Sequence, residues 1–174
     1  MKKKWFSKAF FLPVMFAYSI AIGLVYTGCG TDGSGSESTH QKIYVTADSE
    51  LIYRLDDMIG TGQVEYDGSV GTSFSTPLCL FVDTAGRIYV ADDGNSLIYR
   101  MDDMSGTNQV EYNGDVGTQF TSCRSISMDA AGKIYVADEN GLIYQMDDMS
   151  GTNQIEYDGS AGTLFGDVYS IFVH

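Results

Sequence analysis

The sequence predicts an all-β fold built from three repeats of one four-stranded unit, and three observations lead to that prediction. A stretch of 24 or 25 residues occurs three times, at residues 43–66, 88–112 and 134–157, so the starts are 45 and 46 residues apart. Each copy contains short runs of β-branched and aromatic residues bounded by Asp, Gly and Asn, a pattern typical of strands. Four-residue turns that contain glycine join the copies, as in hairpins. A repeat of this period indicates stacked units, and four antiparallel strands per unit form one blade of a β-propeller.

The N-terminus has the form of a secretory signal. Residues 1–28 carry four lysines and no acidic residue, and they include an uncharged run over residues 9–26. Gly28 then precedes Cys29, which resembles the lipobox of bacterial lipoproteins, although Tyr26 stands where that family usually has an aliphatic residue. The resemblance implies cleavage after Gly28 and lipidation of Cys29. An uncleaved anchor helix and a plain secretory signal are the alternatives, because the run is also long enough to span a membrane.

The residues after the signal form a tether in this interpretation. Residues 29–42 are rich in Gly, Ser and other polar residues and show no hydrophobic periodicity, a composition typical of a flexible linker. We therefore expect a signal peptide or membrane anchor at 1–28, a flexible tether at 29–42 and a three-bladed propeller segment at 43–174.

Four runs in each repeat are expected to be strands. Around the second copy these are residues 78–82, 88–92, 97–101 and 109–112, and residues 125–128 form the equivalent of the first run in the next unit. The runs are apolar almost throughout instead of alternating, which is expected where a sheet is covered on both faces. Blades stacked on one another have that property.

The link between the first two copies resembles the NHL repeat. Residues 77–92 read PLCLFVDTAGRIYVAD and are followed by Asn95 and Ile98, close to the family pattern P-x-G-I-A-V-D-x-x-G-x-I-Y-V-A-D-x-x-N-x-x-I. The resemblance covers residues 43–173 and implies a propeller that typically has six blades. The chain departs from the pattern where Cys79 and its two equivalents replace the usual glycine. The only tryptophan lies in the signal, which disfavours a WD40 propeller.

The two ends of the repeat array are expected to complement each other. The first copy begins at its second strand, and residues 170–173 align with residues 79–82. The C-terminal strand should therefore supply the inner strand that the first blade lacks. Three blades are too few to close a ring, since propellers have four to eight. We expect a homodimer that pairs three blades with three into a six-bladed ring. A strained three-bladed monomer and a truncated gene fragment without independent function are the alternatives.

Acidic residues recur in the turn after the second strand of each unit, and these turns form one face of a propeller. Clustered carboxylates suit hard cations. However, no turn has the D-x-D-x-D-G spacing that wraps a single ion, and Asp, Asn and Gly are also common turn formers. The sequence therefore predicts no metal and no cofactor. The possible ligand-face residues are Asp48, Glu50, Asp92, Asp93, Asp138 and Glu139.

No catalytic constellation is evident in the sequence. One of the two histidines, His40, lies in the tether and the other, His174, is the last residue, so a histidine-based triad or zinc site is disfavoured. Cys79 and Cys123 are out of register on neighbouring units, and we expect them to be free. The tyrosines recur once per unit, which is typical of packing.

The net charge of the chain indicates which kinds of partner it is suited to bind. Residues 29–174 contain 6 basic and 23 acidic residues, a net charge of 6 − 23 = −17. This balance disfavours nucleic acid, because affinity for phosphate depends on Lys and Arg. The expected function is that of a lipoprotein of the bacterial cell envelope, facing the periplasm or the exterior, whose propeller binds a protein or glycan without catalysis. The alternative is an enzyme of the lactonase or lyase type with a metal in the propeller channel. Near-identical repeats argue against that alternative, because an active site needs unlike residues from different blades.

Overall fold

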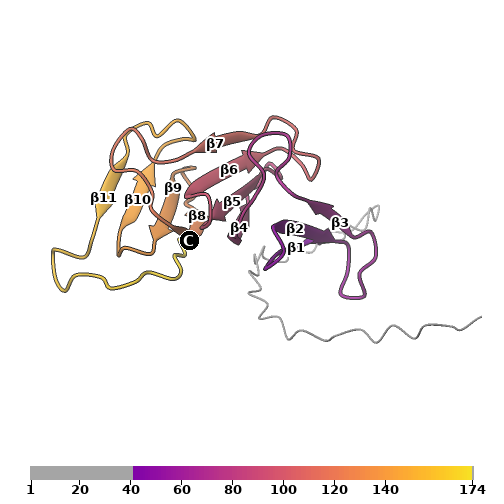
Figure 1. Cartoon of the computed structure of the whole chain (residues 1–174), viewed down its shortest axis with the longest axis horizontal. Coiled ribbons are helices and arrows are strands. Elements are labelled where there is room, and N and C mark those ends of the chain that lie inside the picture. Colours follow the sequence, from indigo (N-terminus) through magenta and orange to yellow (C-terminus); the bar gives the residue numbers. More distant parts are fainter. Residues whose placement is uncertain (1–40, 174) are drawn as a thin grey trace, which may run out of the picture.

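The computed structural model describes residues 41–173, which contain eleven strands in three antiparallel sheets and no helix (Figure 1). The predicted signal or anchor, Cys29, most of the predicted tether and His174 lie outside the described residues. Within residues 41–173, no helix is long and apolar enough to cross a membrane.

Each sheet corresponds to one copy of the repeat and is here called a blade. Blade 1 consists of β1 (Ile43–Ala47), β2 (Leu51–Leu55) and β3 (Val64–Tyr66). Blade 2 consists of β4 (Pro77–Val82), β5 (Ile88–Asp92), β6 (Leu97–Met101) and β7 (Val110–Tyr112). Blade 3 consists of β8 (Cys123–Met128), β9 (Ile134–Asp138), β10 (Ile143–Met146) and β11 (Ile155–Tyr157). The strands that the sequence predicts within the repeats are therefore present to within two residues at each end, and the predicted strand at residues 170–173 is absent.

The blades share one register. In blade 2, Ile88 pairs with Met101. In blade 3, Ile134 pairs with Met146 at the same step of the hairpin. The inner strands β4 and β8 also share an irregularity near their first residue, where the register with the next strand shifts. Equal register places equivalent side chains on the same face of every blade, so a contact made at one junction can recur at the next.

The blades stack side by side along their inner strands, with β1 beside β4 and β4 beside β8. Figure 1 shows this arrangement as an open array that begins with blade 1 and ends with blade 3. Every residue of β5, in the middle blade, is buried. This confirms the expectation that apolar and polar residues do not alternate along such a strand, because both faces of the blade are covered.

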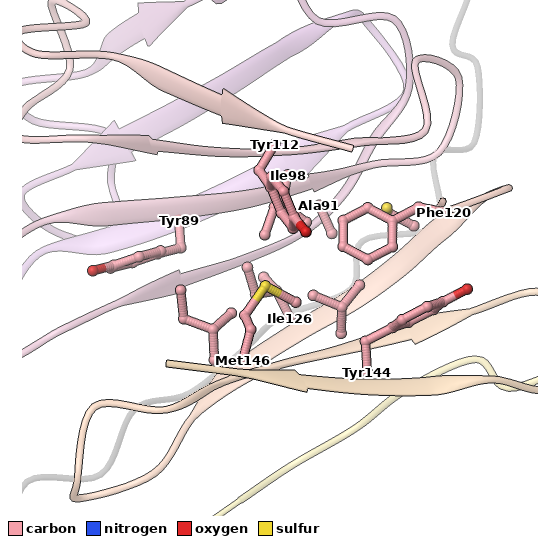
Figure 2. Close-up of a cluster of buried hydrophobic side chains, with 11 residues drawn as sticks. Tyr89, Ala91, Ile98, Tyr112, Phe120, Ile126, Tyr144 and Met146 are labelled. Carbon is pink, nitrogen blue, oxygen red and sulfur yellow. The ribbon is translucent and has the colours of Figure 1, made fainter. Parts of the chain in front are cut away.

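Two hydrophobic cores fill the two junctions between blades. Figure 2 shows the core between blades 2 and 3, in which Tyr89, Ile98 and Tyr112 of blade 2 face Tyr144 and Met146 of blade 3. Tyr144 and Ile98 are completely buried, and full burial of an Ile side chain stabilises the fold by about 1.5–3 kcal/mol. The core between blades 1 and 2 is built in the same way, with the equivalent Tyr99 also completely buried.

The prediction that the C-terminal strand completes blade 1 is wrong within one chain. Blade 1 is a three-stranded sheet with β1 at its inner edge, so the array is not three four-stranded units. Residues 170–173 form no strand and lie against β8, where the Ile171 N–H donates to Ser125 Oγ and the Val173 N–H to Ser127 Oγ, both at 3.1 Å. The reason is geometrical, because three stacked blades do not turn far enough to bring the end of blade 3 back to β1 (Figure 1).

Candidate functional site

One end of the strands forms a loop face, which is composed of the turns at residues 47–50, 92–96 and 138–142 and the segments at 75–76 and 121–122. The segments at 75–76 and 121–122 directly precede the inner strands β4 and β8. The six acidic residues expected to face a ligand all lie here, but they divide into three pairs with different surroundings.

Asp92 and Asp138 are completely buried and act as structural groups. The Asp92 carboxylate accepts hydrogen bonds from the backbone N–H groups of Ser75 (2.8 Å) and Thr76 (2.9 Å). Asp138 accepts the N–H of Thr121 in the same way, at 2.7 Å. Each carboxylate thus fixes the segment that leads into the inner strand of its own blade. Neither carboxylate reaches solvent, so neither is available to a ligand as the sequence suggested.

Asp93 and Glu139 belong to a network at the junction of blades 2 and 3. The Ser122 hydroxyl lies between them, in hydrogen-bond contact with Asp93 and at 3.1 Å from Glu139 Oε2. Glu139 also forms an ion pair with Arg124 at 2.6 Å, and the Arg124 guanidinium lies over the ring of Tyr169, 4.8 Å from its centroid. The hydrogen bond from Arg124 lowers the pKa of Glu139. These two carboxylates reach the surface but are already engaged.

Asp48 and Glu50 are exposed and lie at the edge of a hollow. Blade 1 carries Ala47 at the position where blade 2 carries Asp92, as the strand register demonstrates, since Ala47 pairs with Leu51 and Asp92 with Leu97. No carboxylate fills this position in blade 1, and an open cavity of about 470 Å³ lies there. The residues that line the cavity are Ala47, Asp48, Ser49, Glu50, Ser75 and Thr76.

Glu50 has an unusual backbone conformation for its type. Its φ is 58°, in the left-handed region, where the equivalent residue of blade 3 is Gly141 with a φ of 81°. A side chain other than Gly, Asn or Asp is uncommon in this region because Cβ crowds the backbone. The blade 1 turn therefore holds a carboxylate at the rim of the hollow at some cost in backbone strain.

Sequence reasoning did not identify Ser75, Thr76 and Arg124 as parts of this face. Ser75 and Thr76 stand just before Pro77 and could have been found by following the chain to the start of the inner strand. No repeated sequence pattern pointed to Arg124, because the equivalent residues of the other repeats are the uncharged Leu78 and Tyr169. Within residues 41–173, no group of three or more His, Cys, Asp and Glu side chains is arranged to hold a metal ion. Cys79 and Cys123 are free, as predicted.

Comparison with known proteins supports the fold. No protein-family model matches the chain, and no curated protein matches it. Among solved structures, the structure of U3-55K is similar over 75% of this chain and 38% of its own, with a TM-score of 0.58 and 11% identity. The streptogramin B lyase structure is similar over 78% and 41%, with a TM-score of 0.55 and 23% identity. The structure of apo AztD from Citrobacter koseri is similar over 77% and 35%, with a TM-score of 0.50 and 18% identity.

The chain thus spans about two fifths of the length of the structures that it resembles. At these identities the similarity concerns the fold alone. Three stacked antiparallel sheets and propeller-like neighbours together make the described part of the chain a propeller-like array of blades.

Proposed function

We propose that this chain is a lipoprotein of the bacterial cell envelope whose NHL-like blades bind a protein or glycan without catalysis. The observation that carries the binding role is the hollow at Ala47, which is lined by the two exposed carboxylates Asp48 and Glu50 and by hydroxyl groups. The other four acidic residues of the loop face are engaged in contacts within and between blades, namely Asp92, Asp93, Asp138 and Glu139. The hollow is therefore the part of this face whose carboxylates are open to a ligand.

The chemistry of the hollow favours a ligand that donates hydrogen bonds. Carboxylates accept only, and the hydroxyls of Ser49, Ser75 and Thr76 both donate and accept. A protein segment that carries Lys or Arg suits this lining and the net charge of −17 beyond the signal, which would also accelerate its approach. The hydroxyl groups of a glycan are the other fitting donors.

A photoreactive amino acid placed at Ser49 in the full chain, expressed in cells, tests the binding role. We expect a covalent adduct at this position, and mass spectrometry of the adduct distinguishes a peptide from a sugar. The matched control carries the same group at Thr84, an exposed residue in the turn between β4 and β5 at the opposite end of the strands. The double variant Asp48→Asn, Glu50→Gln should lose the adduct. Equal labelling at both positions, or labelling unaffected by the double variant, would contradict the proposal.

The envelope location is tested separately at Cys29. If the cysteine is lipidated after cleavage at Gly28, the mature chain begins at Cys29 and carries acyl mass, and it sediments with membranes. Mass spectrometry of the membrane fraction measures both properties. A Cys29→Ala variant should lose the lipid. An intact chain that keeps Met1, or a variant that is still cleaved and membrane-bound, would refute the lipoprotein proposal.

Lyase chemistry is not proposed. The similarity to the streptogramin B lyase structure, at 23% identity over 41% of that chain, supports the fold alone.

A further inference from the structure

The junction between blades 1 and 2 is held by a polar latch. The Tyr66 hydroxyl of blade 1 donates to Gln109 Oε1 of blade 2 at 2.7 Å, and Gln109 Nε2 donates to the Gly68 carbonyl at 2.9 Å. The Thr72 N–H donates to Glu111 Oε1 at 2.5 Å. We call the face of a blade that carries the Tyr its trailing face, and the face that carries Gln and Glu its leading face.

The junction between blades 2 and 3 repeats this latch. The Tyr112 hydroxyl donates to Gln154 Oε1 at 2.6 Å, and Gln154 Nε2 donates to the Gly114 carbonyl at 3.1 Å. The Thr118 N–H donates to Glu156 Oε1 at 2.7 Å. The repetition shows that the latch is a property of the repeat and not of one pair of blades.

An aromatic ladder crosses each junction beside the latch. On the trailing side, Tyr112 packs edge-to-face on Phe120, and Phe120 packs in the same way on Tyr144 of the next blade, with centroids 5.7 and 4.8 Å apart. At the other junction Phe74 is likewise 4.9 Å from Tyr99 of blade 2. Such pairs add to the stability that area burial supplies.

The trailing face of blade 3 carries the same groups in exposed form. Tyr157 and Phe165 form the first step of the ladder, with centroids 5.6 Å apart, and the side chains are 44% and 40% exposed. Their equivalents Tyr112 and Phe120 are 6% and 5% exposed. The trailing face of blade 3 is thus half of a junction.

The leading face of blade 1 carries the other half. Gln63 and Glu65 occupy the positions of Gln109 and Glu111 and are exposed. Met58 is 82% exposed, whereas the equivalent Met104 packs into the core between blades 1 and 2 and is 7% exposed. Tyr53 is the equivalent of the completely buried Tyr99. The leading face of blade 1 therefore presents the polar pair, the methionine and the tyrosine that the trailing face of a neighbouring blade contacts at the other junctions.

The inner strands give an independent observation. Cys79 Sγ of β4 lies 3.8 Å from the Ile126 carbonyl of β8, and Ser125 Oγ of β8 lies 3.5 Å from the Ile171 carbonyl. Residues 170–173 therefore sit on β8 as β8 sits on β4, which is the place of an inner strand in a fourth blade. Blade 1 is the sheet that lacks an inner strand.

We propose that blade 3 of one copy docks on blade 1 of a second copy and forms a third junction of the same kind. Tyr157 and Phe165 meet Gln63 and Tyr53 of the second copy, and residues 170–173 pair with its β1. Two copies make two such junctions about a twofold axis and close a six-bladed ring. This inference rests on the junctions alone and does not depend on the ligand proposed above.

The loop face fits this arrangement at one further position. In blade 2 the buried Asp92 holds the segment of Ser75 and Thr76, whereas blade 1 has Ala47 at the position of Asp92. The segment that would arrive at Ala47 from the second copy carries its own carboxylate, Asp167, at the position of Thr76. The second copy thus contributes Asp167 to the edge of the hollow.

Complementation between variants tests the junction. The full chain is studied in detergent by native mass spectrometry, and the parent is expected to have the mass of two copies. Met58→Glu on the leading face and Phe165→Glu on the trailing face are each expected to give one copy. An equimolar, co-expressed mixture of the two variants should restore a dimer with one chain of each kind, because one of its two junctions is then unmodified. Thr84→Glu adds the same charge on an exposed turn and should leave the dimer intact.

Several results would overturn the proposal. A parent chain with the mass of one copy excludes the junction. Failure of the mixture to form a mixed dimer excludes head-to-tail docking, because face-to-face pairing of like surfaces cannot be restored in this way. Circular dichroism verifies that each variant is folded. Glu65→Arg, which changes a side chain that is exposed in the single chain, serves as the second leading-face variant and should also give one copy.

Discussion

A carboxylate that is buried among backbone N–H groups has a different role from one that is exposed a few ångströms away. Asp92 is completely buried with both oxygens engaged, and its neighbour Asp93 reaches the surface. The sequence could place both in a turn, because Asp, Asn and Gly are turn formers. It could not separate them, because the difference depends on Ser75 and Thr76, which are 17 and 16 residues distant from Asp92.

Replacement of Asp92 by Ala should lower the free energy of unfolding by about 2–4 kcal/mol, because the backbone N–H groups of Ser75 and Thr76 both lose a charged acceptor. Asp48→Ala, in the equivalent turn of blade 1, removes an exposed carboxylate and should change the free energy of unfolding by less than about 0.5 kcal/mol. Chemical denaturation of the two variants measures the difference. Equal losses would mean that the Asp92 hydrogen bonds do not stabilise the fold.

Replacement of Glu50 by Gly should raise the free energy of unfolding by about 0.5–1 kcal/mol, because Gly adopts a φ of 58° without strain. The same variant should weaken ligand binding at the hollow. Ser96→Gly is the matched control, since Ser96 also has a positive φ but its hydroxyl donates to the Thr121 carbonyl. In Ser96→Gly, loss of this hydrogen bond should cancel the stability that is gained when the backbone strain is relieved. A Glu50→Gly protein that is less stable than the parent would refute the strain argument.

At the scale of the element, the strands and turns follow from local sequence. Residues 88–92 and 97–101 were expected as strands and are β5 and β6. The repeated register made the equivalent strands of blade 3 equally predictable. The path of residues 170–173 was not predictable in the same way. Their alignment with the inner strands indicates an inner-strand position, but how far three stacked blades turn decides whether β1 of the same chain is within reach.

The turns that carry paired aspartates should make the fold sensitive to acid. Hydrogen bonds from Ser105 lower the pKa of Asp103 from the ordinary value of 3.8 to about 2. Hydrogen bonds from Ser150 do the same for Asp148. A carboxyl whose pKa is lower in the folded than in the unfolded state stabilises the fold above pH 3.8, and this stabilisation is lost as the pH falls towards 2.

We therefore expect the Tm to be constant above about pH 5 and to fall between about pH 4 and pH 2. Thermal melts across this range measure the effect. The double variant Asp103→Asn, Asp148→Asn should have a lower Tm at pH 7 and a shallower fall in acid. A Tm that stays level down to pH 2 would contradict this prediction.

The tyrosine of the latch between blades 2 and 3, and its exposed equivalent on blade 3, provide a matched pair of variants. Tyr112→Phe removes the hydroxyl that donates to Gln154 and accepts the Val116 N–H, and should lower the free energy of unfolding by about 1–2 kcal/mol. Tyr157→Phe removes the equivalent exposed hydroxyl and should leave the unfolding of the single chain almost unchanged, while weakening the dimer about tenfold. Denaturation and dilution series measure the two effects. A Tyr157→Phe dimer as tight as the parent would exclude the latch from the new junction.

At the scale of the whole molecule, the open array leaves two blade faces that are built for burial. If roughly 200 Å² of apolar surface is covered on each face, at about 25 cal/mol per Å², each of the two junctions favours association by on the order of 10 kcal/mol before the entropic cost. The sequence predicted the blades because their pattern is local. Closure of the ring depends on contacts between copies, which the local pattern does not describe. The structure identifies the two faces that would meet, because Tyr157 and Met58 are exposed where their equivalents in blade 2 are buried.

Deletion of residues 170–174 should dissociate the dimer and leave the three blades folded. Within one chain the segment contacts β8 through hydrogen bonds with the hydroxyl groups of Ser125 and Ser127 and makes no backbone ladder with it, so its loss should cost little stability there. Between copies it would provide the inner strand of blade 1 and a full ladder of hydrogen bonds along β1, which an edge strand otherwise leaves open. The native mass and the Tm of the deletion, compared with removal of residue 174 alone, separate these roles. A deletion that remains dimeric would show that residues 170–173 do not complete the second copy's blade 1.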